Sequence, residues 1–98
     1  MTNKQYIIEI FTGLGFKKRE DYTSFVQLDS RNKVSSFSIF SIVISDKVFY
    51  VMLHNADTND YLFSQHYKLD MTEEELQKTI RKIIGLYEHF KSLFWEQK

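Results

Sequence analysis

Two neighbouring segments of this chain are apolar on both sides, and this feature constrains the fold more than any other. Segment 36–45 carries Phe, Ile or Val at both odd and even positions, and segment 48–53 does the same. Side chains of a strand alternate between the two faces of a sheet, so each segment has two apolar faces. The short connection Asp46-Lys47 between them predicts a hairpin at the centre of a sheet. Such a sheet needs cover on both sides.

Further strand patterns flank this hairpin. Residues 22–28 are rich in aromatic and β-branched residues, and residues 31–33 form a predicted turn. After a polar loop at 55–60, residues 61–69 alternate more cleanly between two sides than the central segments do. The apolar side carries Tyr61, Phe63, Gln65, Tyr67 and Leu69, and the other carries Ser64, His66 and Lys68. This alternation predicts an edge strand.

The start of the chain has the signals of a helix. Thr2 and Gln5 have the spacing of a capping box, in which side chain and backbone satisfy each other at the first turn. Gly15 is placed to end the helix in the left-handed conformation, with Phe16 contacting Phe11 as in a Schellman motif.

A second helix is predicted near the end of the chain. Thr72 and Glu75 repeat the capping-box spacing, and three glutamates place negative charge at the positive end of the helix dipole. The predicted helix runs from about Glu73 to Trp95, roughly 34 Å, which overhangs a small sheet. One apolar stripe follows it: Leu76, Ile80, Ile83, Ile84, Tyr87, Phe90 and Phe94.

The element order predicts one α+β domain over residues 1–98. It comprises an N-terminal helix, an antiparallel sheet of about four strands and a long C-terminal helix packed on the sheet. If both helices lie on the same side, the opposite face presents apolar groups to water, and a large apolar patch usually marks a partner or self-association site. In the alternative arrangement the helices cover opposite faces, or the sheet curls around one of them.

Composition excludes several classes of protein. A chain of 98 residues supports a single core. It has no cysteine, which excludes disulfides, thiolate nucleophiles and zinc sites built on sulfur. The first ten residues lack the pattern of a secretory signal, and the longest apolar run, Val48–Leu53, is far short of the roughly 18 residues of a membrane span. A cytoplasmic protein without a membrane partner is expected.

No motif with catalytic or metal-binding chemistry is present. His54, His66 and His89 are far apart and lack ligand spacing, and no serine stands in a G-x-S-x-G elbow. Gly13 and Gly15 form a lone G-x-G that ends a helix, whereas a phosphate loop follows a strand. The sequence therefore predicts no enzyme, no catalytic residue, no metal and no cofactor.

Nucleic acid is a weaker alternative partner. A helix, several strands and a helix is also the element order of double-stranded RNA-binding domains, which grip phosphates with basic residues at the last helix. Here residues 73–75 are glutamates, and Glu20 and Asp21 dilute the basic triplet that precedes them. A net charge of zero adds no general attraction.

The aromatic content is the remaining functional signal. Nine Phe, six Tyr and one Trp are many for this length, and aromatic side chains anchor protein interfaces. The chain is therefore predicted to be a small non-enzymatic protein-binding module that acts by steric occlusion: an adaptor, inhibitor or immunity-type factor.

Its Lys-, Ile- and Asn-rich composition is typical of AT-rich genomes, including phages and mobile elements. The predicted binding residues are Phe40, Tyr50, Phe94 and Trp95, with Lys17, Lys18 and Arg19 as a charged rim. The alternative is a homodimer that pairs sheet faces or terminal helices.

Overall fold

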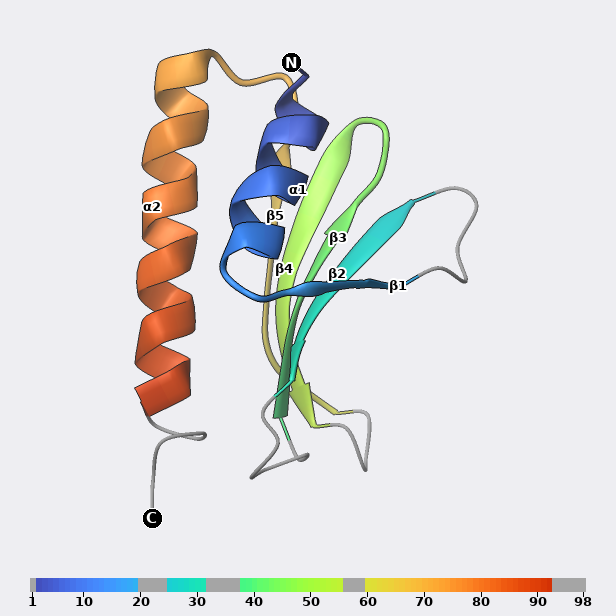
Figure 1. The fold of residues 1–98 in the computed structure, drawn as a ribbon, viewed down its shortest axis with the longest axis vertical. Coiled ribbons are helices and arrows are strands. Elements are labelled where there is room, and N and C mark those ends of the chain that lie inside the picture. Colours follow the sequence, from blue (N-terminus) through green and yellow to red (C-terminus); the bar gives the residue numbers. More distant parts are fainter. Residues whose placement is uncertain (1, 20–24, 32–37, 56–59, 93–98) are drawn as a thin grey trace.

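The structure, a computed structural model, describes residues 2–19, 25–31, 38–55 and 60–92 (Figure 1). Within these ranges the chain forms two helices and five strands. In chain order they are α1 (Asn3–Gly13), β1 (Lys17–Arg19), β2 (Val26–Arg31), β3 (Ser38–Ile44), β4 (Val48–Asn55), β5 (Tyr61–Lys68) and α2 (Glu73–Phe90). This is the α+β fold predicted from the sequence, with five strands where about four were expected.

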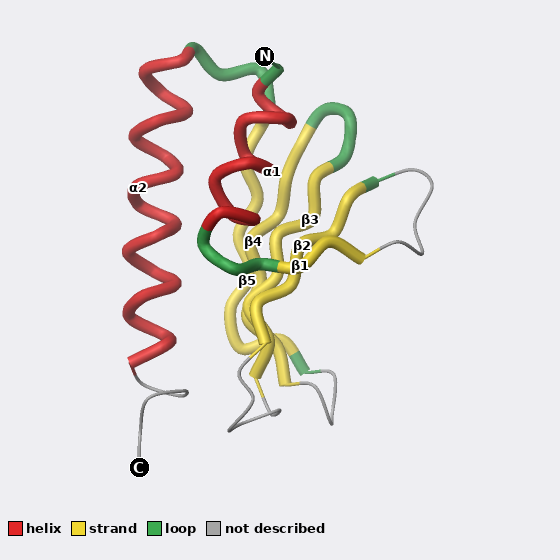
Figure 2. The backbone as a smooth tube through the Cα atoms, in the orientation of Figure 1, coloured by secondary structure: helices red, strands yellow, loops and turns green. Residues whose placement is uncertain are grey.

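The strands form one antiparallel sheet in the order β1-β2-β3-β4-β5, so each strand pairs with its neighbour in sequence. The predicted central hairpin is confirmed as β3 and β4, and the backbone N–H of Ser45 donates to the carbonyl of Val48 at its turn (2.9 Å). Both helices lie on the same side of this sheet, α2 alongside α1 (Figures 1 and 2). The arrangement with helices on opposite faces is therefore excluded.

The first two strands differ from the prediction. β1 was not predicted, because three consecutive cations carry no apolar alternation, and it forms through its pairing with β2. Arg31, predicted in a turn, belongs to β2, which begins at Val26. Residues 22–24, predicted as strand, and residues 32 and 33 of the predicted turn lie outside the described residues.

The edge strand β5 is confirmed, with one local exception. Phe63 lies opposite Leu53, but a register shift then places Tyr61 opposite His54. Tyr61 was predicted on the apolar side of the strand, and the shift leaves it 62% exposed. An irregular pairing of this kind moves a side chain out of the alternation of the strand.

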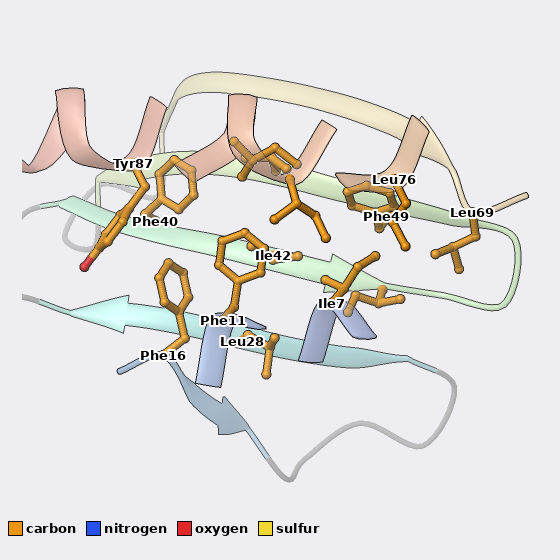
Figure 3. Close-up of a cluster of buried hydrophobic side chains, with 14 of the residues drawn as sticks. Ile7, Phe11, Phe16, Leu28, Phe40, Ile42, Phe49, Leu69, Leu76 and Tyr87 are labelled. Carbon is orange, nitrogen blue, oxygen red and sulfur yellow. The ribbon is translucent and has the colours of Figure 1, made fainter. Parts of the chain in front are cut away.

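The core lies between the sheet and the two helices (Figure 3). Phe16 is its aromatic centre, with ring centroids 5.2 Å from Phe11, 5.0 Å from Tyr87 and 6.1 Å from Phe40. These edge-on contacts join α1, α2 and the sheet in one cluster. The side chains buried completely or almost so include Ile7, Phe11, Leu28, Phe40, Ile42, Ile44, Phe49, Val51, Leu53 and Ile83.

The stop of α1 has the predicted geometry. Gly15 has a φ of 99°. The N–H of Phe16 donates to the carbonyl of Phe11 (3.0 Å), and the N–H of Gly15 donates to the carbonyl of Thr12 (3.1 Å). These are the two bonds of a Schellman motif. The stop directs Phe16 back into the core.

The start of α2 is also confirmed, since Thr72 and Glu75 form a reciprocal capping box. The helix is described to Phe90, and Lys91 and Ser92 continue it in a π-helical turn. Residues 93–95 of the predicted helix lie outside the described residues. Within the described part of the chain, neither helix has the length and apolar character of a membrane span.

We predict that Gly15→Ala lowers the free energy of unfolding by about 1–2 kcal/mol, because a Cβ is strained at positive φ. Gly13→Ala is the matched control: it lies in the last turn of α1, and neither position has a heavy atom within 4 Å of an added Cβ. Urea unfolding of the three proteins measures the difference. Equal effects at both positions would show that the conformation of Gly15 is unimportant.

The capping box of α2 predicts a pH dependence of stability. Hydrogen bonds from the backbone and then the side chain of Thr72 lower the pKa of the Glu75 carboxyl. The stabilisation by ionised Glu75 is thus complete above the ordinary glutamate pKa and is lost as the pH falls through the lowered value. We expect Glu75→Gln to remove this part of the acid dependence in denaturant titrations. Glu74→Gln, one position earlier in the same exposed turn, should retain it.

Candidate functional site

The candidate site is the face of the sheet opposite the two helices, which we call the open face. Cross-strand partners in an antiparallel sheet point to the same side. One row across this face comprises Val43, Tyr50 and His66, and the next comprises Ser41, Met52 and Ser64. The helix layer covers the alternate residues of the same strands, which form the core.

The part of the open face over β4 carries large apolar groups. Tyr50 is 39% exposed, and its ring centroid lies 5.9 Å from that of His66 on β5. Val43 on β3 and Val48 and Met52 on β4 are half-buried around it. We call Val43, Val48, Tyr50 and Met52 the apolar patch. Beside it, β5 begins with two exposed residues, Tyr61 (62%) and Leu62 (54%).

The part of the open face around Asp29 on β2 and Ser41 on β3 is polar and closely bonded. Ser41 is completely buried, and its hydroxyl donates to Oδ1 of Asp29 (2.8 Å). The side-chain amide of Gln27 donates to the same oxygen (2.9 Å), and Nη1 of Arg19 lies 3.7 Å from Oδ2. Asp29, on β2, is therefore linked to β1 by an ion pair and to β3 by a charge-assisted hydrogen bond.

His54 extends this network to β4. Its Nε2 lies 3.4 Å from Oγ of Ser41. With the hydroxyl proton directed to Asp29, this contact is a hydrogen bond only in the tautomer of His54 that carries its proton on Nε2. Nδ1 of His54 is buried and has no hydrogen-bond partner.

Serine, histidine and carboxylate, the residue types of a serine nucleophile system, are thus present together. The hydrogen bonds among them, however, are arranged differently. In such a system the histidine accepts the serine proton, whereas here the carboxylate does, and the hydroxyl is buried. The contacts among these side chains join β2, β3 and β4. Among the described residues, no three metal-ligating side chains come together.

Sequence reasoning missed this network. Its members come from separate strands, and strand register sets which of them meet. One signal was available, since Ser41 is the single polar residue within Ile39–Ile44, which is otherwise apolar on both faces. A polar residue at such a position needs a hydrogen-bond partner when buried.

The two predicted binding residues on the sheet, Phe40 and Tyr50, lie on opposite faces. Tyr50 lies on the open face, but Phe40 points to the other side, completely buried among Phe16, Tyr87 and Phe90. The alternation of side chains along β3 places Phe40 under the helices. Phe40 therefore contributes to the core and not to an exposed surface. Phe94 and Trp95 lie outside the described residues.

The predicted rim, Lys17, Lys18 and Arg19, is the whole of β1, and all three residues are exposed. Strand pairing divides it between the two faces. Lys17 and Arg19 share the side of Asp29, and Lys18 lies on the side of Leu28. Only two of the three cations therefore border the open face.

A separate hollow of about 770 Å³ lies beside the start of α1. Three lysines and two aspartates line it, so their charges largely offset one another: Lys4, Lys47, Lys68, Asp46 and Asp70. Asn3 in its wall is already bonded to the carbonyls of Leu69 (2.6 Å) and Met71 (3.0 Å). This hollow has the character of a charged surface recess.

Comparison of the chain with protein-family models, with curated proteins and with solved structures finds no match. The candidate site is therefore inferred from the geometry of this chain alone.

We predict that Ser41→Ala destabilises the fold by about 1–3 kcal/mol, because it removes a donor to the Asp29 carboxylate and leaves His54 without its contact. Ser64→Ala, on the same face but exposed, should change stability by less than about 0.5 kcal/mol. Urea unfolding compares the two. A neutral Ser41 variant would show that the network does not hold the strands together.

Proposed function

We propose that this chain is a small non-enzymatic binding module that covers part of another protein with the open face of its sheet. The observation that carries the proposal is the one-sided placement of the helices. Both α1 and α2 pack on the same face (Figure 1), and Tyr50 is 39% exposed among half-buried apolar groups on the other. Groups of this kind in the middle of a sheet gain most by burial against a partner.

The apolar patch has the composition of an interface centre. Tyrosine is among the residues that contribute most to binding, because it buries a large rigid ring and keeps a polar tip. The neighbouring Met52 adapts to irregular surfaces. Around the patch, Arg19 and Asp29 on one side and Lys68 on the other supply charges that orient a partner.

The mechanism proposed is steric occlusion, in which the sheet denies its partner access to other molecules. The module itself then needs no reactive group. An adaptor, an inhibitor and an immunity-type factor, including one carried by a phage or other mobile element, all work in this way. We place this action in the cytoplasm.

The nucleic-acid alternative receives less support from the structure. The cations of β1 lie on both sides of the sheet, and Arg19 is already beside Asp29. Binding to a phosphate backbone depends on clustered cations. Three glutamates occupy the first turn of α2, which lies on the side of the sheet that the helices cover.

The test compares three tagged proteins: the wild type, the patch variant Tyr50→Thr with Met52→Thr, and the control variant Arg81→Ala with Lys82→Ala. Threonine keeps the strand propensity of β4, and the control residues are exposed on α2. Proteins recovered from host cells are quantified by mass spectrometry. A recovered candidate is then purified and titrated against each form.

We expect one protein to bind the wild type and the control equally and the patch variant roughly 30-fold more weakly, as for loss of an aromatic anchor. In hydrogen exchange, the complex should protect the backbone of β4 and leave α2 unchanged. The proposal is wrong if the partner binds the patch variant as tightly as the wild type, or if protection falls on α2.

A further inference from the structure

The outer edge of β5 has hydrogen-bonding groups that face away from the sheet. The N–H of Leu69 donates to the carbonyl of Lys47 (2.8 Å), which continues the register between β5 and β4. In an antiparallel pair, alternate residues direct both backbone groups to the neighbouring strand. Gln65 and Tyr67 therefore bond to β4 as Leu69 does. The backbone groups of Ser64, His66 and Lys68 point outward, and these three side chains are exposed.

The two edges of the sheet are not equally protected. Natural proteins block edge strands with short length, charge, proline or covering elements. β1 is three residues long, and all three are cations. β5 is eight residues long, contains no proline or glycine, and has Lys68 as its single lysine. Its register shift lies at Tyr61, outside residues 63–68. Among the described residues, the sheet is thus protected from pairing at β1 and accessible to it at β5.

We propose that β5 pairs with the β5 of a second copy of this chain, antiparallel about a twofold axis. In this register Gln65 lies opposite the partner's Gln65, and Ser64 lies opposite the partner's His66. Phe63 then faces the partner's Tyr67, an aromatic pair of the kind that stabilises antiparallel sheets. Lys68 lies away from the axis and does not oppose the partner's Lys68.

A second copy suits this edge better than a head-to-tail arrangement of chains. Joining β5 to the β1 of another copy uses only three residues of β1 and leaves a free edge at each end, which leads to open fibres. The symmetric pair uses the longer edge twice and closes the assembly. It also meets the outward N–H and carbonyl groups of Ser64 and His66 on both copies.

The dimer goes beyond the proposed function and does not depend on it. A twofold axis perpendicular to the sheet keeps the helix layers of both copies on one side and joins their open faces on the other. The apolar patches therefore remain accessible. This differs from a dimer in which sheet faces or terminal helices cover each other.

Light scattering after gel filtration measures the assembly directly. At micromolar concentration we expect a mass of twice the chain mass of 11.8 kDa. The patch variant Tyr50→Thr with Met52→Thr should keep this mass, so loss of partner binding and loss of the dimer are distinguished. A wild-type mass of one chain would overturn the proposal.

The register is tested by disulfide formation, because the chain has no cysteine of its own. Residue 65 is a non-hydrogen-bonded position on the axis, where Cα atoms are about 4.5 Å apart, within the range of a disulfide. Gln65→Cys should therefore link two chains under mild oxidation. Ser64→Cys, displaced from its symmetry mate by two residues along the strand, should link far more slowly. Equal linking at both positions would contradict the register.

Charge substitutions give a test that leaves the strand backbone unchanged. Ser64→Lys combined with His66→Lys places like charges opposite each other twice, and should raise the dimer dissociation constant about tenfold. Ser64→Glu combined with His66→Lys places opposite charges there and should restore the dimer. Both positions are exposed, so each single chain should fold. Equal dissociation constants for the two variants would overturn the pairing.

Discussion

The side-chain amide of Asn3 joins the first turn of α1 to the segment before α2, and with the shared core this contact holds both helices on one face of the sheet. It donates to the carbonyls of Leu69 and Met71, in the segment between β5 and α2. The first turn of α1 is thereby fixed beside the start of α2. Since α1 is already placed on the core by Phe11, both helices are held on one face of the sheet. The open face exists because neither helix reaches it.

The open face is stabilised differently in its two halves. Over β2 and β3, buried polar side chains satisfy one another through Asp29, which removes any need for a covering element. Over β4, Tyr50 and Met52 have no such partners on the open face among the described residues, and they carry the apolar area. A partner that covers β4 gains burial there without disturbing the network, and this division is why the proposed binding site is centred on Tyr50.

The sequence predicted the parts of the fold that depend on neighbouring residues. Both capping boxes and the glycine stop of α1 are set within a few positions of the chain, and they were found in the structure as predicted. The hairpin of β3 and β4 followed from alternation and a short turn. By contrast, β1 has no local strand signal and forms only through β2. The bulge at Tyr61 also depends on pairing with another strand.

The candidate site was harder to predict because it depends on which face the helices cover. Alternation alone places Phe40 and Ser41 on opposite sides of β3 but does not say which side is buried. The prediction therefore grouped Phe40 with Tyr50, and the packing of Phe40 on Tyr87 separates them. The contacts among Asp29, Ser41 and His54 required the register of three strands.

The order of the strands also bears on how this protein acquires its structure. Every strand pairs with its neighbour in sequence, so each step of the sheet closes only a short loop, and local pairing of this kind favours rapid folding. The bond from Asn3 to Leu69, in contrast, spans 66 positions. We expect the five strands to pair first and the two helices to dock onto the sheet afterwards. The core would then be shielded from water only in the last step of folding.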